Sequence, residues 1–188
     1  STGSIRYSEI YNGETIDARL EKAGWTLPGY DDGNWSKIKA VQHPMDILVT
    51  TRNEPVRKQE TFVPVKVFKT PAGEQVIDFG QNLVGWVQMK VTGKAGEKVV
   101  LSHAEVLDKA GNFYTENLRQ AKAQNTYILK GAGTEVFEPH FTWQGFRYLK
   151  IEGYPGEIKP ENFTAVAIYS DMKPTGTFTS SDALINQL

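Results

Sequence analysis

Short runs of alternating apolar and polar residues recur along the chain between residues 61 and 175. Valines occupy every second position from Val63 to Val67, and from Val84 to Thr92 apolar residues alternate with polar ones along much of the run. A period of two predicts β-strands, whose successive side chains point to opposite faces of a sheet. The strands expected from this pattern are 63–68, 75–79, 84–92, 97–105, 125–130, 141–152 and 164–170.

Turn signals separate these runs. The chain contains 17 glycines and 9 prolines spread along its whole length, and some of them fall in the turns expected at 70–73, 80–82, 93–96 and 108–112, between the predicted strands. Many short strands divided by turns are typical of an all-β fold, so we predict an antiparallel, jelly-roll-like β-sandwich with short helical segments. One such segment is expected at 115–123, capped by Thr115. Gly145 interrupts the alternation of the longest run, which predicts a β-bulge there.

Two flanking regions do not share the pattern. Residues 1–42 alternate only weakly and include a turn-rich stretch, and 43–60 is a polar segment typical of a connector. The sandwich is expected over 61–175. At the other end, 176–188 is expected to lead into a further domain, because Ser180–Asp182 could cap a helix that runs to Leu188. We therefore expect both Ser1 and Leu188 to be cut points in a longer protein.

Composition excludes several classes of function. Lys and Arg together number 21 against 22 for Asp and Glu, which gives a net charge of -1 and no broad basic field for nucleic acid. The chain has no cysteine, so thiol catalysis, thiolate metal sites and disulfides are excluded within it. No apolar run approaches the ~20 residues of a membrane span. The compartment is left open between cytoplasm, periplasm and the extracellular space.

No catalytic constellation stands out. The three histidines, His43, His103 and His140, fall in unrelated segments without ligand spacing, and His103 at a strand end is the most interesting of them. Acidic pairs such as Glu105 and Asp108 fit the ends of turns better than the flanks of a scissile glycosidic bond. We therefore name no catalytic residue.

Tryptophans are the best candidates for binding. Their faces can stack on the C–H surface of a sugar, although most tryptophans of a β-sandwich are structural. The sugar-stacking candidates are Trp25, Trp35 and Trp86, whereas Trp143 is expected to be packed among its aromatic neighbours.

One turn offers oxygen ligands. Asp31, Asp32 and Asn34 could hold Ca²⁺, but their spacing does not match an EF-hand loop. They are kept as candidate calcium ligands, and no other cofactor is expected.

Five blocks of sequence resemble one enzyme family when taken in order. They are Asp78–Trp86, His103–Leu107, Tyr114–Arg119, Phe141–Tyr148 and Gly153–Gly156, flanked by a head at 5–19 and a tail at 176–186. Together they are similar to the bacterial α-L-rhamnosidases of glycoside hydrolase family 78, across essentially the whole chain. Asn125 and Gln144 depart from the pattern, where Asp and His are often expected.

The resemblance implies a division of labour. In that family a helical (α/α)₆ barrel carries the acidic pair that hydrolyses terminal α-L-rhamnosides with inversion, and the barrel would begin where this chain ends. A calcium-dependent rhamnose-binding module would lie mostly before Ser1, and residues 1–42 would be the C-terminal end of this preceding N-terminal β-domain. The resemblance therefore implies that this piece is inactive alone and that its partner is the missing helical catalytic domain.

Two roles follow from these expectations. In the first, the sandwich is a non-catalytic accessory domain that supports the barrel of a rhamnosidase acting on rhamnose-containing glycans. In the second, it is a carbohydrate-binding module with weak affinity for rhamnose or plant glycans, built on the tryptophans and the acidic turn.

Overall fold

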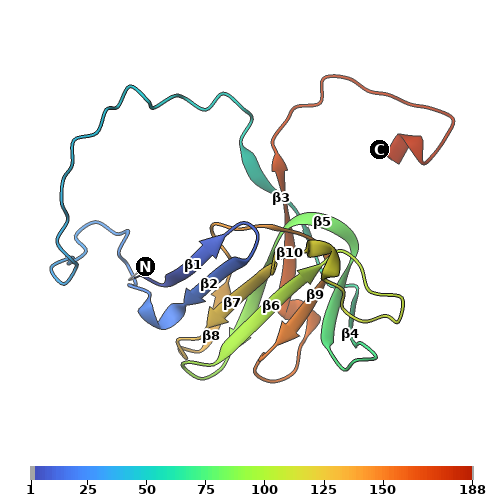
Figure 1. The fold of residues 1–188 in the computed structure, drawn as a ribbon, viewed down its shortest axis with the longest axis horizontal. Coiled ribbons are helices and arrows are strands. Elements are labelled where there is room, and N and C mark those ends of the chain that lie inside the picture. Colours follow the sequence, from blue (N-terminus) through green and yellow to red (C-terminus); the bar gives the residue numbers. More distant parts are fainter. Residues whose placement is uncertain (1–2, 188) are drawn as a thin grey trace.

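The computed structural model describes residues 3–187, and it confirms the predicted all-β class. Ten strands form one curled sheet, while helix is limited to four single 3₁₀ turns among the described residues (Figure 1). Ser1, where a cut point is expected, and Leu188, the last residue of the predicted helix, lie outside that range.

The strands follow the predicted runs closely in the middle of the chain. The bounds are β1 Ile5–Glu9, β2 Gly13–Asp17, β3 Val56–Phe62, β4 Lys66–Lys69, β5 Gln75–Thr92, β6 Lys98–Ala104, β7 Gln124–Ile128, β8 Thr134–Phe137, β9 Gln144–Glu152 and β10 Phe163–Ser170. Their order across the sheet is β1-β2-β7-β6-β9-β5-β10-β3, with β4 and β8 also paired to β5. All pairs are antiparallel except β2 with β7.

Strand β5 joins the two halves of the curled sheet. Its first half pairs with β4 and β9, and its second half pairs with β8 and β10. The register with β9 shifts between Asp78 and Leu83, so the extra residues lie on β5, where Gly80 adopts a φ of 86°. The bulge predicted at Gly145 is therefore wrong, because Gly145 pairs in register with Val84.

The core fills the space enclosed by the curl. Phe146 lies 5.8 Å from Phe79 and 5.0 Å from His103, ring centroid to ring centroid. Across the fold, Tyr127 of β7 meets Phe137 of β8 at 5.0 Å. Rings from neighbouring strands, and from β7 and β8, which do not pair, thus meet inside the fold, and Phe79, Tyr127, Phe137 and Phe146 belong to one apolar cluster.

The N-terminal hairpin is part of the same sheet. Strand β2 runs parallel to β7, and Glu14, almost fully buried, accepts hydrogen bonds from the backbone N–H groups of His140 and Phe141 at 3.0 Å. The side-chain oxygen of Asn125 accepts from the Glu14 backbone at 3.0 Å. Asn125, one of the two departures from the family pattern, therefore fixes the hairpin to β7.

Two predicted helices are largely wrong. In 115–123 only the 3₁₀ turn Glu116–Leu118 forms, and Thr115 makes no side-chain cap. In 180–188 only Ile185–Gln187 forms a 3₁₀ turn, with Leu184 exposed. An apolar stripe stabilises a helix by packing, and within residues 3–187 this one packs against nothing.

The segment that precedes β3 and the segment that follows β10 contain no strand among the described residues. We call residues 36–55 the first arm and residues 171–187 the second arm; the only helix or strand in either is the last 3₁₀ turn. Strand β3 begins at Val56, inside the segment predicted as a connector. The domain boundaries themselves stay a prediction.

Candidate functional site

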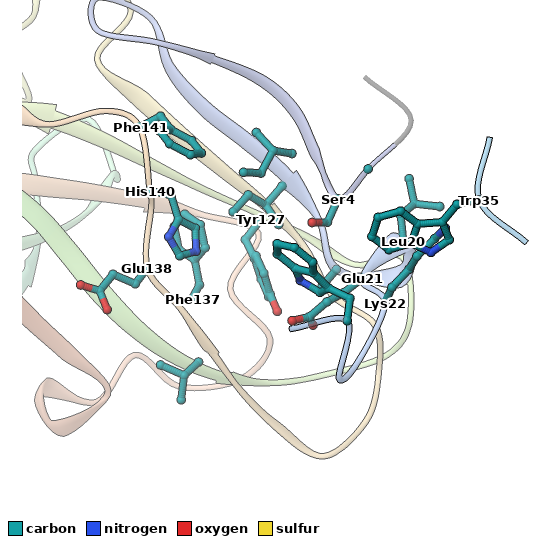
Figure 2. Close-up of a pocket in the computed structure, with 16 residues that line it drawn as sticks. Ser4, Leu20, Glu21, Lys22, Trp35, Tyr127, Phe137, Glu138, His140 and Phe141 are labelled. Atoms are coloured by element: carbon teal, nitrogen blue, oxygen red, sulfur yellow. The ribbon is translucent and has the colours of Figure 1, made fainter. Parts of the chain in front are cut away.

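A cavity of about 750 Å³ opens beside the N-terminal hairpin. Its floor comes from Ile16, Tyr127 and Phe137 of the sheet, and its walls from the loop after β2 and the segment after β8. Figure 2 shows Tyr127 between two groups of side chains, with Glu138 and His140 on one side and Lys22 and Trp35 on the other. The volume suits a small ligand, and the lining is mostly apolar.

Two of the predicted sugar-stacking residues meet at this cavity. Trp25 and Trp35 lie 6.3 Å apart, ring centroid to centroid, and both line the opening. Trp35 is already contacted by Tyr30, edge-on at 5.9 Å, and by the Lys22 ammonium, 4.7 Å from its ring centre. Trp25 is the freer of the two, with 59% of its surface exposed. The pair could present an aromatic platform, chiefly through Trp25.

Trp86 lies outside the cavity lining. Its indole Nε1 donates to Glu138 at 2.7 Å, and the Lys58 ammonium sits 5.6 Å from its ring centre while also pairing with Glu138. A half-buried indole held in this way is explained by the ion pair that it supports. Its proposed role in sugar stacking stays a prediction.

The acidic turn is exposed and locally bonded. Asp31 accepts from the backbone N–H of Gly33 at 2.9 Å, and the Asp32 carbonyl accepts from Trp35 at 2.8 Å. Across residues 3–187 no group of three or more His, Asp or Glu side chains is placed to hold a metal ion. Calcium binding by Asp31, Asp32 and Asn34 therefore stays a prediction, resting on one turn.

Most polar groups of the cavity already have partners. Glu21 pairs with Lys130 at 3.2 Å, and the Tyr127 hydroxyl donates to Glu135 at 2.9 Å. Burial raises the pKa of Tyr127, and the hydrogen bond to Glu135 raises it further. Burial also opposes ionisation of Glu138, but hydrogen bonds from its neighbours outweigh it and lower the pKa of Glu138. Glu21 and Glu138, the two carboxylates that line the cavity, are thus already bonded to other side chains of the protein.

The side chains left for a ligand are few. Among the described residues, Ser4, Lys22 and His140 line the cavity without a side-chain hydrogen bond. Sequence patterns missed Lys22 and His140 because loops bring them to the cavity, and loops carry no periodic signal. The predicted packing of Trp143 is wrong, because 47% of its surface is exposed. His103 is fully buried.

Comparison with known proteins identifies relatives over the whole chain. The family model of the bacterial alpha-L-rhamnosidase concanavalin-like domain matches residues 68–169, and that of the alpha-L-rhamnosidase N-terminal domain matches residues 1–60. An alpha-L-rhamnosidase of Streptomyces avermitilis is 40% identical over 189 residues, and one of Formosa agariphila is 36% identical over 188. These matches take in 100% and 99% of this chain but 18% and 20% of the relatives.

Solved structures agree. The crystal structure of the native rhamnosidase from Aspergillus terreus superposes with a TM-score of 0.90 at 39% identity, over 100% of this chain and 22% of its own. The Streptomyces avermitilis rhamnosidase complexed with L-rhamnose gives 0.89 at 39% identity, over 100% and 18%. The chain thus spans about a fifth of the proteins that it resembles.

Proposed function

This chain belongs to the bacterial α-L-rhamnosidase family, and from that premise we propose that it is a non-catalytic accessory β-domain of a longer α-L-rhamnosidase. The observation that carries the proposal is coverage: relatives match the whole chain with about a fifth of their own length. The remainder would contain the helical catalytic domain that hydrolyses terminal α-L-rhamnosides. Within residues 3–187 no helix is long and apolar enough to cross a membrane.

The state of the carboxylates supports a non-catalytic role. A glycosidase needs two carboxyl groups that face the scissile bond across an open site. Here Glu14 and Glu135 accept backbone hydrogen bonds in the interior, Glu138 is held by Lys58 and Trp86, and Glu21 is paired with Lys130. Each of these acids already stabilises a loop or a strand edge.

Deletion tests the supporting role. We expect the full-length enzyme lacking residues 3–187 to lose at least about tenfold in kcat/KM on a chromogenic α-L-rhamnoside, or to lose several degrees of its unfolding midpoint. The 188-residue chain alone should give no turnover. Unchanged activity and midpoint after deletion would refute the supporting role, and turnover by the chain alone would refute the non-catalytic assignment.

A second role, as a carbohydrate-binding module, is favoured by the Trp25 and Trp35 pair at the cavity. The relative from Streptomyces avermitilis was solved with L-rhamnose bound, which makes L-rhamnose the first ligand to test. A neutral sugar would stack on Trp25 and bond to Ser4, Lys22 or His140. The Asp31 turn would contribute only if calcium orders the loop.

Tryptophan fluorescence can test this second role. Titration with L-rhamnose, with and without Ca²⁺, should give a saturable change that Trp25→Ala abolishes. Trp143→Ala is the matched control, because Trp143 is comparably exposed and lies outside the cavity lining. A flat titration of the unmodified chain would eliminate the binding role.

A further inference from the structure

The two arms carry large apolar side chains that the residues described, 3–187, leave mostly exposed. In the first arm Ile38 is 95% exposed and Val49 is 88% exposed, and in the second arm Phe178 is 75% exposed. Met45, Ile47, Leu48, Met172 and Leu184 are also exposed. Apolar residues scattered singly on a surface are ordinary, but several large ones exposed on each of two segments mark an interaction surface.

Both arms start from one point on the sheet. The backbone N–H of Asp171 donates to the Pro55 carbonyl at 2.9 Å, and the Asp171 carboxylate pairs with Arg57 at 3.1 Å. Just inside this contact, Ser170 of β10 pairs with Val56 of β3. Beyond it the arms separate and bend in opposite directions above the sheet (Figure 1). The two arms therefore diverge from a point that is held by the contacts of Asp171 with Pro55 and Arg57.

An exposed apolar patch lies at the same end of the sheet. Gly85 of β5 pairs with Gln144 of β9, which places Val84 and Trp143 near the end toward which β10 runs. The Thr142 hydroxyl donates to the Glu9 carbonyl at 3.2 Å, which brings the β1–β2 turn alongside. We call the exposed residues gathered here the end patch: Ile10, Tyr11, Val84, Phe141 and Trp143.

The arms share their course with relatives that contain more chain. They make up about a fifth of the residues described, and the superposition on the Aspergillus terreus rhamnosidase covers 100% of this chain at a TM-score of 0.90. Different courses over so many residues would pull the score well below this value. Extended segments with few internal hydrogen bonds keep one path when an outside surface holds them.

We propose that the arms and the end patch form one docking surface for the part of the full-length rhamnosidase polypeptide that lies outside this chain. The inference rests on the proposed accessory function and names the surface that performs it. The occupant belongs to the same polypeptide because about four-fifths of each relative lies outside the matched region. Its facing surface presents apolar groups to the exposed apolar side chains of the arms, such as Ile38, Val49 and Phe178.

Cysteine reactivity can map this surface, because the chain has no cysteine of its own. Single variants Val49→Cys, Phe178→Cys and Tyr11→Cys report on the two arms and the end patch. Ala132→Cys is the matched control, since Ala132 is exposed in the turn before β8, and β8 pairs with the opposite end of β5. Each variant is made in the 188-residue chain and in the full-length protein, with any cysteine outside this region replaced by serine.

In the 188-residue chain, all four thiols should react with a maleimide at similar rates. In the full-length protein the three surface thiols should react at least about tenfold more slowly, whereas the Ala132→Cys thiol keeps its rate. Equal rates in both proteins for the Val49→Cys and Phe178→Cys thiols would overturn the proposal. So would protection that appears in the 188-residue chain as its concentration rises, because the occupant would then be a second copy.

The outcome separates this proposal from the accessory function. If deleting residues 3–187 impairs the enzyme while the arm thiols stay reactive, the accessory function stands and the docking surface is wrong. If the arm thiols are protected and deletion changes neither activity nor midpoint, the surface is correct and the supporting role fails.

Discussion

Large apolar residues are buried in the curled sheet and exposed in the two arms. In the sheet, Phe146 has no exposed surface and packs against Phe79 and His103. In the second arm, Phe178 is exposed. The sheet thus buries its large apolar side chains within the chain, whereas those of the arms can be buried only against an outside surface. A stability measurement on the 188-residue chain should therefore report on the sheet alone.

The largest difference in stability is expected between two phenylalanine-to-alanine substitutions, one in the sheet and one in the second arm. Phe146→Ala should destabilise the chain by roughly 3–5 kcal/mol, because it removes a buried ring and leaves a cavity. Phe178→Ala should change stability by less than about 0.5 kcal/mol. Urea unfolding of the two variants checks the contrast, and a large effect of Phe178→Ala would show that the arm packs on the sheet.

A second contrast concerns the β1–β2 hairpin. At Gly13, φ is 93°, and a Cβ atom would lie 1.8 Å from the Gln124 carbonyl oxygen, so Gly13→Ala should cost roughly 3 kcal/mol. Gly133→Ala is the control, because φ there is 79° but no atom lies within 4 Å, and it should cost about 1 kcal/mol. Thermal unfolding of both variants separates the clash from the backbone strain. Equal costs would mean that the hairpin is not seated tightly on β7.

The buried carboxylate of the hairpin gives a smaller effect. Glu14→Gln places an amide N–H₂ group opposite a backbone N–H, of either His140 or Phe141, and should cost about 2 kcal/mol. Glu54→Gln, in the exposed first arm, should be neutral. Denaturant midpoints measure both. A neutral Glu14→Gln would contradict the structural role given to this acid.

The sequence predicts more of the sheet than of the other regions, and the reason is physical. Strand β9 and the second half of β5 alternate between buried and less buried residues, so the sequence shows their period of two and predicts the all-β class. The hairpin was missed because its anchor, Glu14, is a buried acid satisfied by a loop 126 residues away. The bulge was assigned to Gly145 since pairing register is a tertiary property. The cavity was found only in part, through Trp25 and Trp35, because Lys22 and His140 reach it on loops.

The mildest expected effect is a pH dependence of the sheet. Burial lowers the pKa of His103 to about 4, while the Nδ1 contact to the Ala123 carbonyl opposes the shift only partly. The unfolded chain takes up this proton near pH 6.5 and the folded chain does not, so stability is full above pH 6.5 and falls toward pH 4. The loss between pH 7 and pH 6 should be less than about 1 kcal/mol.

Variants can assign this slope. His103→Gln should flatten it, and His43→Gln, in the exposed first arm, should preserve it. Asp17 and Asp78 contribute only at lower pH, because hydrogen bonds from Arg19 and Arg147 lower the pKa of each carboxylate. An unchanged slope in His103→Gln would show that another group titrates in this range.

Limited digestion with trypsin tests most directly whether the sheet is self-sufficient and the arms are not. The first arm contains Lys37, Lys39 and Arg52, all exposed. In the 188-residue chain, the peptide bonds that follow these three residues should be cut first, while the sheet from β3 to β10 stays intact. In the full-length protein, the same three bonds should resist cleavage. Cleavage at equal rates in both proteins would contradict the account, because the arms would then have no partner in the full-length polypeptide.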